Sequence, residues 1–283
     1  MPADGVRPVT GLIVNFASKV VRHRGLIRSM VQRDLKSRYV GSVMGIFWSV
    51  IHPLALLVCY TFVFSVIWKL QIQHPRFPET GTASFALYLF CGILPWMMFQ
   101  ETLTRSSNVL VDNANLITKT LFPSEILPVA VLIANLVNHL IGLAIFLVII
   151  LFYLKDLSLF VLLIPLHLLP LMLFALGLSW VVSSLQVFLR DTAQVVTVVL
   201  TFWFWFTPIF YSEEHLAKVS DKLVLAMRFN PLAEVVIAYR KMLLFAEMPS
   251  WQGMIPLYGM ALVTFVCGGL LFRYVKRSFA DVL

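Results

Sequence analysis

Six long stretches without Asp, Glu, Lys or Arg limit how this chain can fold more than any other feature of its sequence. They cover residues 39–68, 80–100, 126–154, 157–189, 192–212 and 248–272. About 20 helical residues cross the roughly 30 Å hydrocarbon layer of a bilayer. Backbone groups in lipid must be hydrogen-bonded internally, which a helix achieves and an isolated strand does not. The stretches therefore predict an all-α integral membrane protein with six transmembrane helices.

The composition argues against a soluble globular protein and against a nucleic-acid-binding protein. Hydrophobic residues make up 60% of the 283 residues and charged residues only 13%, whereas soluble domains have roughly 45–50% and 25%. A chain of this length cannot hide so much apolar surface in a core of its own. The net charge of +8 does not indicate a nucleic-acid partner, because the basic residues lie between apolar stretches and form no single patch.

The positions of Lys and Arg predict the orientation of the helices. Eight of the 22 basic residues precede the first stretch, and two, Lys69 and Arg76, follow it before the second. Cytoplasmic loops carry the excess of these residues, so the N-terminus is expected in the cytoplasm. Six spans return the C-terminus to the same side. This gives a cytoplasmic segment at 1–38, a transmembrane domain at 39–275 and a cytoplasmic tail at 276–283.

Residues 24–39 predict a basic amphipathic helix before the first span. Asp34 and Arg38 lie near its apolar stripe and are spaced to form an i,i+4 salt bridge. The basic residues suit anionic membrane lipids at the inner leaflet. Two interpretations stay open, simple anchoring to the membrane and docking to another protein. The apolar stripe consists of Ile27, Met30, Val31 and Leu35.

The cytoplasmic loop at 111–128 is unusually apolar for a solvated segment. Exposed apolar patches usually mark binding surfaces, so a short helix here could insert into a cytoplasmic partner with Lys119 at its rim. The alternative is that the loop packs on its own bundle. The apolar residues are Leu116, Ile117, Leu121 and Phe122.

Aromatic residues gather in the first and fifth stretches. Tyr60, Phe64 and Trp68 recur every four residues and form one stripe, which could stack on sugar rings or could be ordinary helix packing. The five consecutive aromatic residues at 202–206 surround their helix, so an interfacial belt is the favoured interpretation for most of them. Pro208 follows them and is expected to kink the fifth span near its outer end.

The exterior segment at 213–247 has apolar residues at helical spacing. The pattern predicts an amphipathic helix that lies on the outer leaflet or dips into it; an ordinary surface helix is the alternative. The apolar residues at this spacing are Leu232, Val235, Val236, Tyr239 and Leu243.

Polar residues within the spans are few. Asn135, Asn138 and His139 share one side of the third stretch and either bond between helices or face a wet pathway. The middles of the spans have no acidic residue, which counts against an ion-coupled transporter; His52 and His167 alone are weak candidates for a proton relay.

Catalytic and metal-binding signatures are absent from the sequence. It has no zinc-protease motif, no nucleophile elbow and no G-x-x-x-x-G-K-[ST] phosphate loop. Cys59, Cys91 and Cys267 are far apart, without paired or metal-ligand spacing. If ATP drives this protein, another subunit must bind it.

Short motifs follow one another in a specific order over roughly residues 24–275. They are Arg33-Asp34-Leu35-Lys36-Ser37-Arg38-Tyr39 with Ser42, Gly45, Trp48 and Pro53, then Gly92-Ile93-Leu94-Pro95-Trp96 with Phe99, Asn115-Leu116-Ile117 with Lys119, Phe122-Pro123, Leu127-Pro128, Arg190-Asp191, Thr207-Pro208-Ile209 with Tyr211, Asn230-Pro231 and Arg240. In this order the chain resembles the permease subunits of type-2 ATP-binding-cassette exporters, which move bacterial O-antigen, capsular polysaccharide or teichoic acid.

The resemblance implies a homodimer joined to two cytoplasmic ATPase subunits, which would bind the ATP and Mg, so that this chain needs no cofactor of its own. It places the protein in the bacterial cytoplasmic membrane with a lipid-linked polysaccharide as its cargo. The ATPase-coupling residues are then expected to be Arg33, Asp34, Arg38, Asn115, Leu116, Lys119, Phe122, Arg190 and Asp191. The exterior segment resembles the re-entrant gate helices of the family, which assigns Pro208, Asn230, Pro231 and Arg240 to a gate.

A passage wide enough for a sugar needs more helices than one chain supplies, which independently favours a dimer. We expect the polymer to pass along the first span, the fifth span and the gate. The side chains expected to line its path are Trp48, Tyr60, Phe64, Trp68, Phe202, Phe206 and Tyr211.

Three other functions remain open from the sequence. An exporter of the same type with another cargo (a drug, a lipid or haem) would share the fold and lose the sugar-stacking role. A membrane-embedded glycosyltransferase or ligase needs acidic or metal-binding residues that are sparse here. A purely structural scaffold is not excluded by the aromatic or gate-like features.

Overall fold

The computed structural model describes residues 18–38, 45–72, 74–77, 81–120, 122–212, 216 and 220–283. Within these ranges every regular element is a helix and none is a strand, so the all-α prediction is confirmed. Residues 1–17, together with Tyr39 and Ser42 of the motifs above and Leu121 of the apolar loop, lie outside the described residues.

Four of the described helices are long and apolar enough to cross a membrane. They are α4 (Thr82–Asp112), α6 (Ile126–Leu154), α7 (Ile164–Phe188), which the 3₁₀ turn η3 (Leu159–Leu163) precedes, and α12 (Trp251–Val275). The first and fifth stretches form shorter apolar helices. These are α3 (Trp48–Thr61), continued by the π-helical η2 (Phe62–Ile67), and α8 (Thr192–Phe206). All six stretches therefore contain a helix, and a topology with six crossings stays a prediction.

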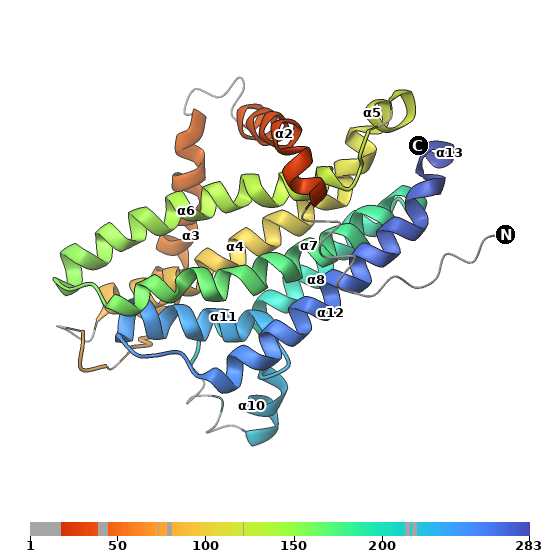
Figure 1. Ribbon diagram of the computed structural model, residues 1–283. Coiled ribbons are helices and arrows are strands. Elements are labelled where there is room, and N and C mark those ends of the chain that lie inside the picture. The colour runs from red at the N-terminus through yellow and green to blue at the C-terminus, as the bar shows by residue number, and fades with distance from the viewer. Residues whose placement is uncertain are drawn as a thin grey trace.

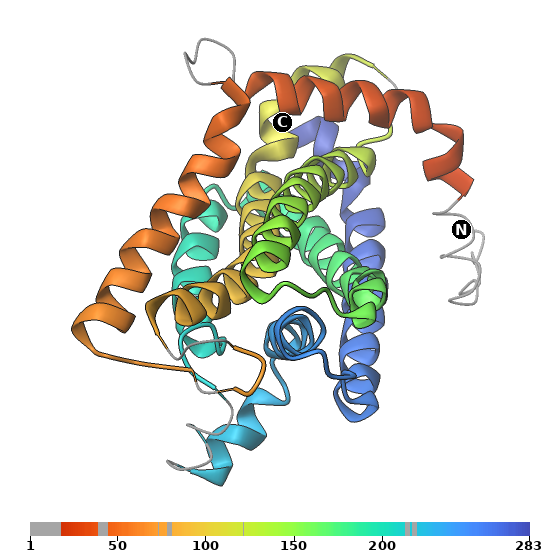
Figure 2. The ribbon, with the colours of Figure 1, turned by 90° about the vertical axis from the view of Figure 1, so that its left-hand side faces the viewer.

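Short helices gather at the two ends of the bundle (Figure 1). At one end, called the inner end below, lie α2 (Arg24–Ser37), α5 (Ala114–Lys119) and α13 (Phe279–Val282). α10 (Asp221–Met227) lies at the opposite, outer end. Figure 2 shows α2 crossing above the bundle, where it packs against α6, and shows α3 standing at the edge of the bundle.

The close approach of α7 and α12 depends on glycine. A Cβ atom at Gly268 would overlap the backbone oxygen of Gly177, and one at Gly177 would overlap the backbone oxygen of Thr264 and lie 2.7 Å from Phe265 N. Small residues let two membrane helices touch backbone to backbone, which strengthens dispersion contacts where water supplies no hydrophobic driving force. α7 and α12 therefore form one closely packed pair.

Two helices differ in length from the stretches that predicted them. α4 continues to Asp112, beyond the end of the charge-free stretch at Gln100. α8 ends at Phe206, six residues before the end of its stretch. Thr207 has an extended backbone (φ −89°, ψ 135°), as the residue before a proline usually does. The expected kink at Pro208 is therefore wrong, because the helix has ended before the proline.

The exterior amphipathic helix exists as α11 (Pro231–Arg240), followed by the π-helical η4 (Lys241–Phe245). Its apolar stripe is fully buried against α4, α7 and α12, and Figure 2 shows α11 nearly end-on among the other helices. The stripe faces protein, so an ordinary surface helix does not describe it. The buried residues of the stripe are Leu232, Val235, Val236, Tyr239 and Leu243.

Candidate functional site

A cluster of charged side chains joins α2 to α4 at the inner end. Arg38 Nη2 lies 2.7 Å from Asp34 Oδ2, so the predicted i,i+4 salt bridge is confirmed. Arg38 Nη1 lies 2.9 Å from Glu101 Oε1, and Arg105 Nη2 pairs with the other oxygen of Asp34. Positive and negative side chains therefore alternate in the order Arg105, Asp34, Arg38, Glu101. Each of the two central groups, Asp34 and Arg38, has partners of opposite charge, which stabilises these charged groups where they are partly buried.

The same cluster reaches α6 through the side-chain amide of Asn135. Arg38 Nη2 donates to Asn135 Oδ1 at 2.7 Å, and Asn135 Nδ2 donates to Thr102 Oγ1 at 3.1 Å. Only 7% of the Arg38 side chain is exposed. A planar guanidinium has donors in fixed directions, so Arg38 fixes α2 relative to both α4 and α6. Arg33 adds a bond of 2.6 Å to Asn113 Oδ1 at the start of α5.

A second ionic site holds the chain termini to the start of α6. Glu125 forms salt bridges with Lys19, at 2.8 Å, and with Lys276. Burial of Glu125 would raise its pKa, but the hydrogen bonds from the two lysines outweigh burial and lower its pKa to about 2. The carboxylate is therefore ionised at physiological pH and binds three segments together.

The apolar loop forms the short helix α5, as the binding hypothesis required. Asn115 and Lys119 are exposed and Leu116 is half-buried. Ile117 and Phe122 pack partly against the core. The patch is thus shared between the chain's own bundle and the surface, and α5 also packs against α13.

The turn between α7 and α8 presents Arg190 and Asp191 to the surface. Gln186 holds this turn: its Nε2 donates to Arg190 O at 3.0 Å and to Asn108 Oδ1 of α4 at 3.1 Å, and its Oε1 accepts from Ala193 N at 2.8 Å. These bonds fix the turn to the C-terminal part of α4, close to the start of α5.

The aromatic side chains of α3 and α8 meet in one cluster. Phe64 stacks on Phe210 with ring centroids 4.5 Å apart, and Tyr60 lies edge-on to the same ring at 5.1 Å. The packing interpretation therefore accounts for Tyr60 and Phe64. Tyr211 is half-buried, and its hydroxyl donates to Trp205 O.

The other proposed path residues remain on the surface of the monomer. Phe206 is 70% exposed, Phe202 and Trp68 are each 64% exposed, and Trp48 is 49% exposed. They are available for lipid, for polymer or for a second copy.

Asn230 and Pro231 begin α11 deep within the bundle. Pro231 is the first helical residue, where a missing N–H costs nothing. Asn230 Oδ1 accepts from Trp203 Nε1 at 2.9 Å and from Leu232 N at 3.1 Å. The Trp203 ring contacts Phe99, a residue in the middle part of α4, at 5.3 Å. The helix thus starts far from the ends of the long helices.

Arg240 ends α11 as a buried charge, only 3% exposed. Its guanidinium donates to Pro208 O at 2.6 Å, to Ile209 O at 2.7 Å and to Tyr88 O at 3.4 Å. It also lies 3.5 Å from the centroid of the Tyr88 ring, a cation–π contact. Arg240 therefore fastens the turn after α8 to α11 and α4, and brings the predicted gate residues Pro208 and Arg240 together.

The polar residues of the third stretch bond between helices. His139 bonds Leu94 O at 3.3 Å and the Tyr239 hydroxyl at 3.0 Å, and Asn135 bonds α2 and α4 as described above. Among the described residues the structure gives the Asn138 Oδ1 atom no partner. The interpretation of interhelical bonding thus holds for Asn135 and His139.

Sequence reasoning missed four of the residues that build this region, Glu101, Arg105, Glu125 and Gln186. The charges of Glu101, Arg105 and Glu125 were visible, but no local spacing pairs these residues with their distant partners. Gln186 lies four residues before Arg190, so its place near the turn was a local signal. Over the part of the chain that the structure describes, no group of three or more His, Cys, Asp or Glu side chains is placed to hold a metal ion.

Comparison with known proteins adds the following. The sequence pattern of the ABC-2 type transporter family matches residues 25–244. An O-antigen export system permease protein RfbA of Myxococcus xanthus is 28% identical over 271 residues, which cover 95% of this chain and 99% of the relative. Two proteins of the same name from Klebsiella pneumoniae are each 27% identical over 259 residues, or 91% of this chain and 95% of the relative. The family match contains the cluster around Arg38 and all of α11.

Proposed function

Because this chain belongs to the ABC-2 type transporter family, we propose that it is the membrane-spanning subunit of an ATP-driven exporter of lipid-linked polysaccharide, of the O-antigen or capsule type. It is a multi-pass protein of the inner membrane and a transport subunit, not an enzyme. The observation that carries the cargo assignment is the match over 99% of the length of an O-antigen export permease. The polymer crosses the cytoplasmic membrane through this subunit.

The family implies an ABC ATPase as the partner of this subunit. We assign the binding surface to three elements of the inner end: α2, α5 and the turn at Arg190 and Asp191. Exposure supports this, since Asn115, Lys119 and the two turn residues all reach the surface. A motor subunit that closes on ATP must push on segments of this kind, because this chain has no phosphate loop of its own.

The ionic cluster around Arg38 supports a route for that push into the membrane. Displacing α2 displaces Asp34 and Arg38, which are bonded to Glu101 and Arg105 of α4 and to Asn135 of α6. Charge-assisted hydrogen bonds in a partly buried place are stiff and short. α2 and the inner parts of α4 and α6 therefore move together.

The passage itself is assigned to the boundary between two copies of the chain, each with six spans. Four aromatic residues are exposed: Trp48 on α3, Trp68 directly after η2, and Phe202 and Phe206 on α8. Aromatic faces stack on the C–H faces of sugars without demanding one sugar sequence. α11, whose start lies at the depth of Trp203 and whose end is fixed by Arg240, acts as the gate on the outer side.

The decisive experiment is reconstitution of this chain with its ABC ATPase, followed by ATP hydrolysis with and without lipid-linked glycan. We expect stable co-purification and a several-fold stimulation of hydrolysis by the glycan. Stimulation by a hydrophobic drug but not by the glycan would point to another cargo. Sugar transfer by the permease in the absence of the ATPase would point to a glycosyltransferase and overturn the proposal.

A matched pair of variants tests the assignment of α5. Leu116→Asp places a charge on the partly exposed face of α5 and should reduce co-purification of the ATPase at least tenfold, because an unpaired carboxylate would be desolvated at the interface. Leu225→Asp makes the same change on α10 at the outer end, where Leu225 is exposed, and should have no effect. Equal retention of the ATPase by both variants contradicts the assignment.

A further inference from the structure

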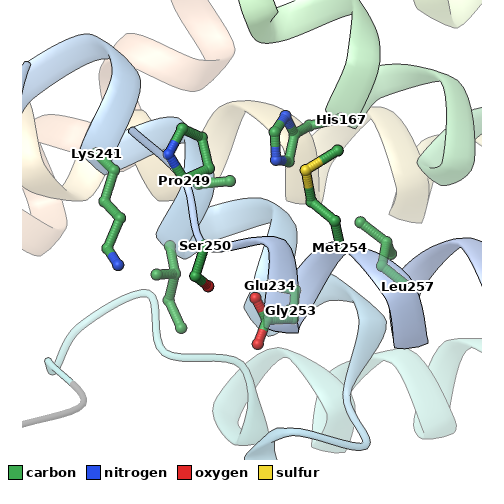
Figure 3. A pocket seen from close by; sticks show the side chains of 10 residues that line it. His167, Glu234, Lys241, Pro249, Ser250, Gly253, Met254 and Leu257 are labelled. Carbon is green, nitrogen blue, oxygen red and sulfur yellow. The ribbon is translucent and has the colours of Figure 1, made fainter. Parts of the chain in front are cut away.

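The carboxylate of Glu234 in α11 lies directly over Gly253 in the first turn of α12. A Cβ atom at Gly253 would overlap Oε2 and Cδ of Glu234 and would lie 2.8 Å from Oε1. The Glu234 carboxylate thus occupies the space in which every other residue type carries its side chain. Figure 3 shows Glu234 against Gly253 at the edge of a hollow between α7, α11 and α12.

Electrostatics favours a carboxylate in this place. The first N–H groups of a helix have no intrahelical partner, and the helix dipole makes this end positive. Ser250 precedes α12, but its side chain makes no capping hydrogen bond. Glu234, from another helix, supplies the negative charge that the start of α12 lacks from its own cap.

The other described residues that line the hollow include a lysine and no second carboxylate. Lys241 of η4 and His167 of α7 line it together with Ser250 and Met254 (Figure 3). His167 is only 2% exposed, and within the described residues its Nε2 atom has no hydrogen-bond partner. Among the described residues of this lining, no second negative charge opposes the Glu234 carboxylate.

α11 is fastened in three directions. Asn230 bonds its start to Trp203 of α8, and Arg240 bonds its end to Pro208 and Ile209. Glu234, between them, reaches α12. We propose that Glu234 is a positioning residue that holds the gate helix on the sixth membrane helix in the closed state, and that Gly253 is present because only glycine leaves room for it. This inference rests on the gate role proposed above for α11.

The test is a pair of glycine substitutions in one helix. Gly253→Ala should displace the carboxylate, whereas at Gly259, also in α12, a Cβ atom meets nothing within 4 Å. Both changes gain about 1 kcal/mol of helix propensity, so Gly259→Ala controls for it. The measurement is efflux of a small hydrophilic dye, without ATP, from liposomes that contain the permease–ATPase complex. We expect several-fold faster efflux for Gly253→Ala and wild-type efflux for Gly259→Ala.

Substitutions of Glu234 separate positioning from folding. Glu234→Gln keeps the size and removes the charge, and should also leak while the complex assembles and hydrolyses ATP normally. Glu234→Asp is one methylene shorter, so in the Gly253→Ala background it should restore a tighter seal.

Wild-type efflux for both Gly253→Ala and Glu234→Gln overturns the inference. If Gly253→Ala does not fold, Glu234→Gln alone decides. Failure of the wild-type complex to export glycan would instead overturn the proposed function, so the two failures are distinguishable.

Discussion

Arg38 is the residue at which three segments of the inner end meet. Its guanidinium bonds Asp34 of its own helix, Glu101 of α4 and Asn135 of α6. The bonds leave from three separate nitrogen atoms, Nε, Nη1 and Nη2, whereas an ammonium group must make all its bonds from one nitrogen. The consequence is that charge alone cannot replace this side chain.

We therefore predict that Arg38→Lys lowers the free energy of unfolding by about 2 kcal/mol, a typical loss for a hydrogen bond to a charged group. ATP hydrolysis by the complex should continue while glycan export per ATP falls. Melting of the purified complex and the ratio of export to hydrolysis measure the two effects. Arg28→Lys, on an exposed position of the same helix, is the control. An Arg38→Lys variant with wild-type stability and coupling would contradict this role.

Glu125 gives a prediction about pH. Its pKa in the folded protein, about 2, lies below the ordinary value of 4.5, so its ionised form contributes stability above pH 4.5 that is lost as pH falls toward 2. The contribution is on the order of 2 kcal/mol, because the lysine partners are partly exposed and screened. Glu125→Gln should be less stable than wild type at pH 7, and the difference should shrink below pH 4.5.

Melting temperatures of the two proteins measured from pH 3 to pH 7 test this prediction. Subtracting the two curves removes the other carboxylates, which titrate in both proteins. A difference that stays constant over this range would show that Glu125 does not act through its charge.

The residue-scale features differ in how well the sequence could predict them. The Asp34–Arg38 pair was predictable because both residues lie on one helix, where spacing determines contact. Glu101 and Arg105 were not, because their charges indicate only the end of an apolar stretch, and which helix they face is decided by tertiary packing. Likewise the stripe at Tyr60 and Phe64 was visible, but its partner Phe210 was not.

At the scale of elements, α13 supports α5. Phe279 of α13 is fully buried, with its ring 5.3 Å from Phe272 and 6.2 Å from Phe188. α13 packs against α5 and α7. The segment predicted as a cytoplasmic tail thus contains a helix that packs onto the bundle, next to the helix assigned to the ATPase.

Removing this support should weaken attachment of the ATPase. Phe279→Ala leaves a cavity that costs about 3 kcal/mol and should loosen α13 and α5 together. We expect a lower affinity for the ATPase in a pull-down titration, with membrane insertion unchanged. Tyr274→Ala, at an exposed position of α12, should bind as wild type does. Wild-type affinity of Phe279→Ala would show that α5 holds its position without α13.

Periodicity found α11 but not its surroundings. An apolar stripe shows that one face of a helix avoids water, and lipid and protein satisfy that requirement equally. The long-range hydrogen bonds of Asn230 and Arg240, which the periodicity does not reveal, show that the surroundings of α11 are protein. The early end of α8, in contrast, follows from Pro208, whose effect on the preceding residue is local.

For the whole molecule, the exposed aromatic side chains of α8 are a large apolar surface that the described part of one chain leaves uncovered. Phe202 and Phe206 lie one turn apart on α8 and are both more than 60% exposed. If two copies of the chain meet at α8, each copy covers the exposed aromatic residues of the other, next to the passage. If α8 faces only lipid, no second copy will be near it.

Cysteine crosslinking distinguishes the two arrangements. In a chain whose Cys59, Cys91 and Cys267 are replaced by Ala, Phe202→Cys should form a covalent dimer in membranes on mild oxidation. Phe152→Cys on α6, where the native side chain is 80% exposed, should remain monomeric. Crosslinking of Phe152→Cys alone would move the dimer interface to another face of the bundle.

The glycine contact between α7 and α12 limits how such a transporter can open. With backbones interlocked at Gly177 and Gly268, neither helix can slide or rotate past the other without a steric clash, so the pair behaves as a rigid frame. Conformational change during export is then expected in the elements packed around this frame, among them α3, α8 and the gate helix α11. A bulky side chain at position 268 would force the frame apart and disturb both membrane faces at once.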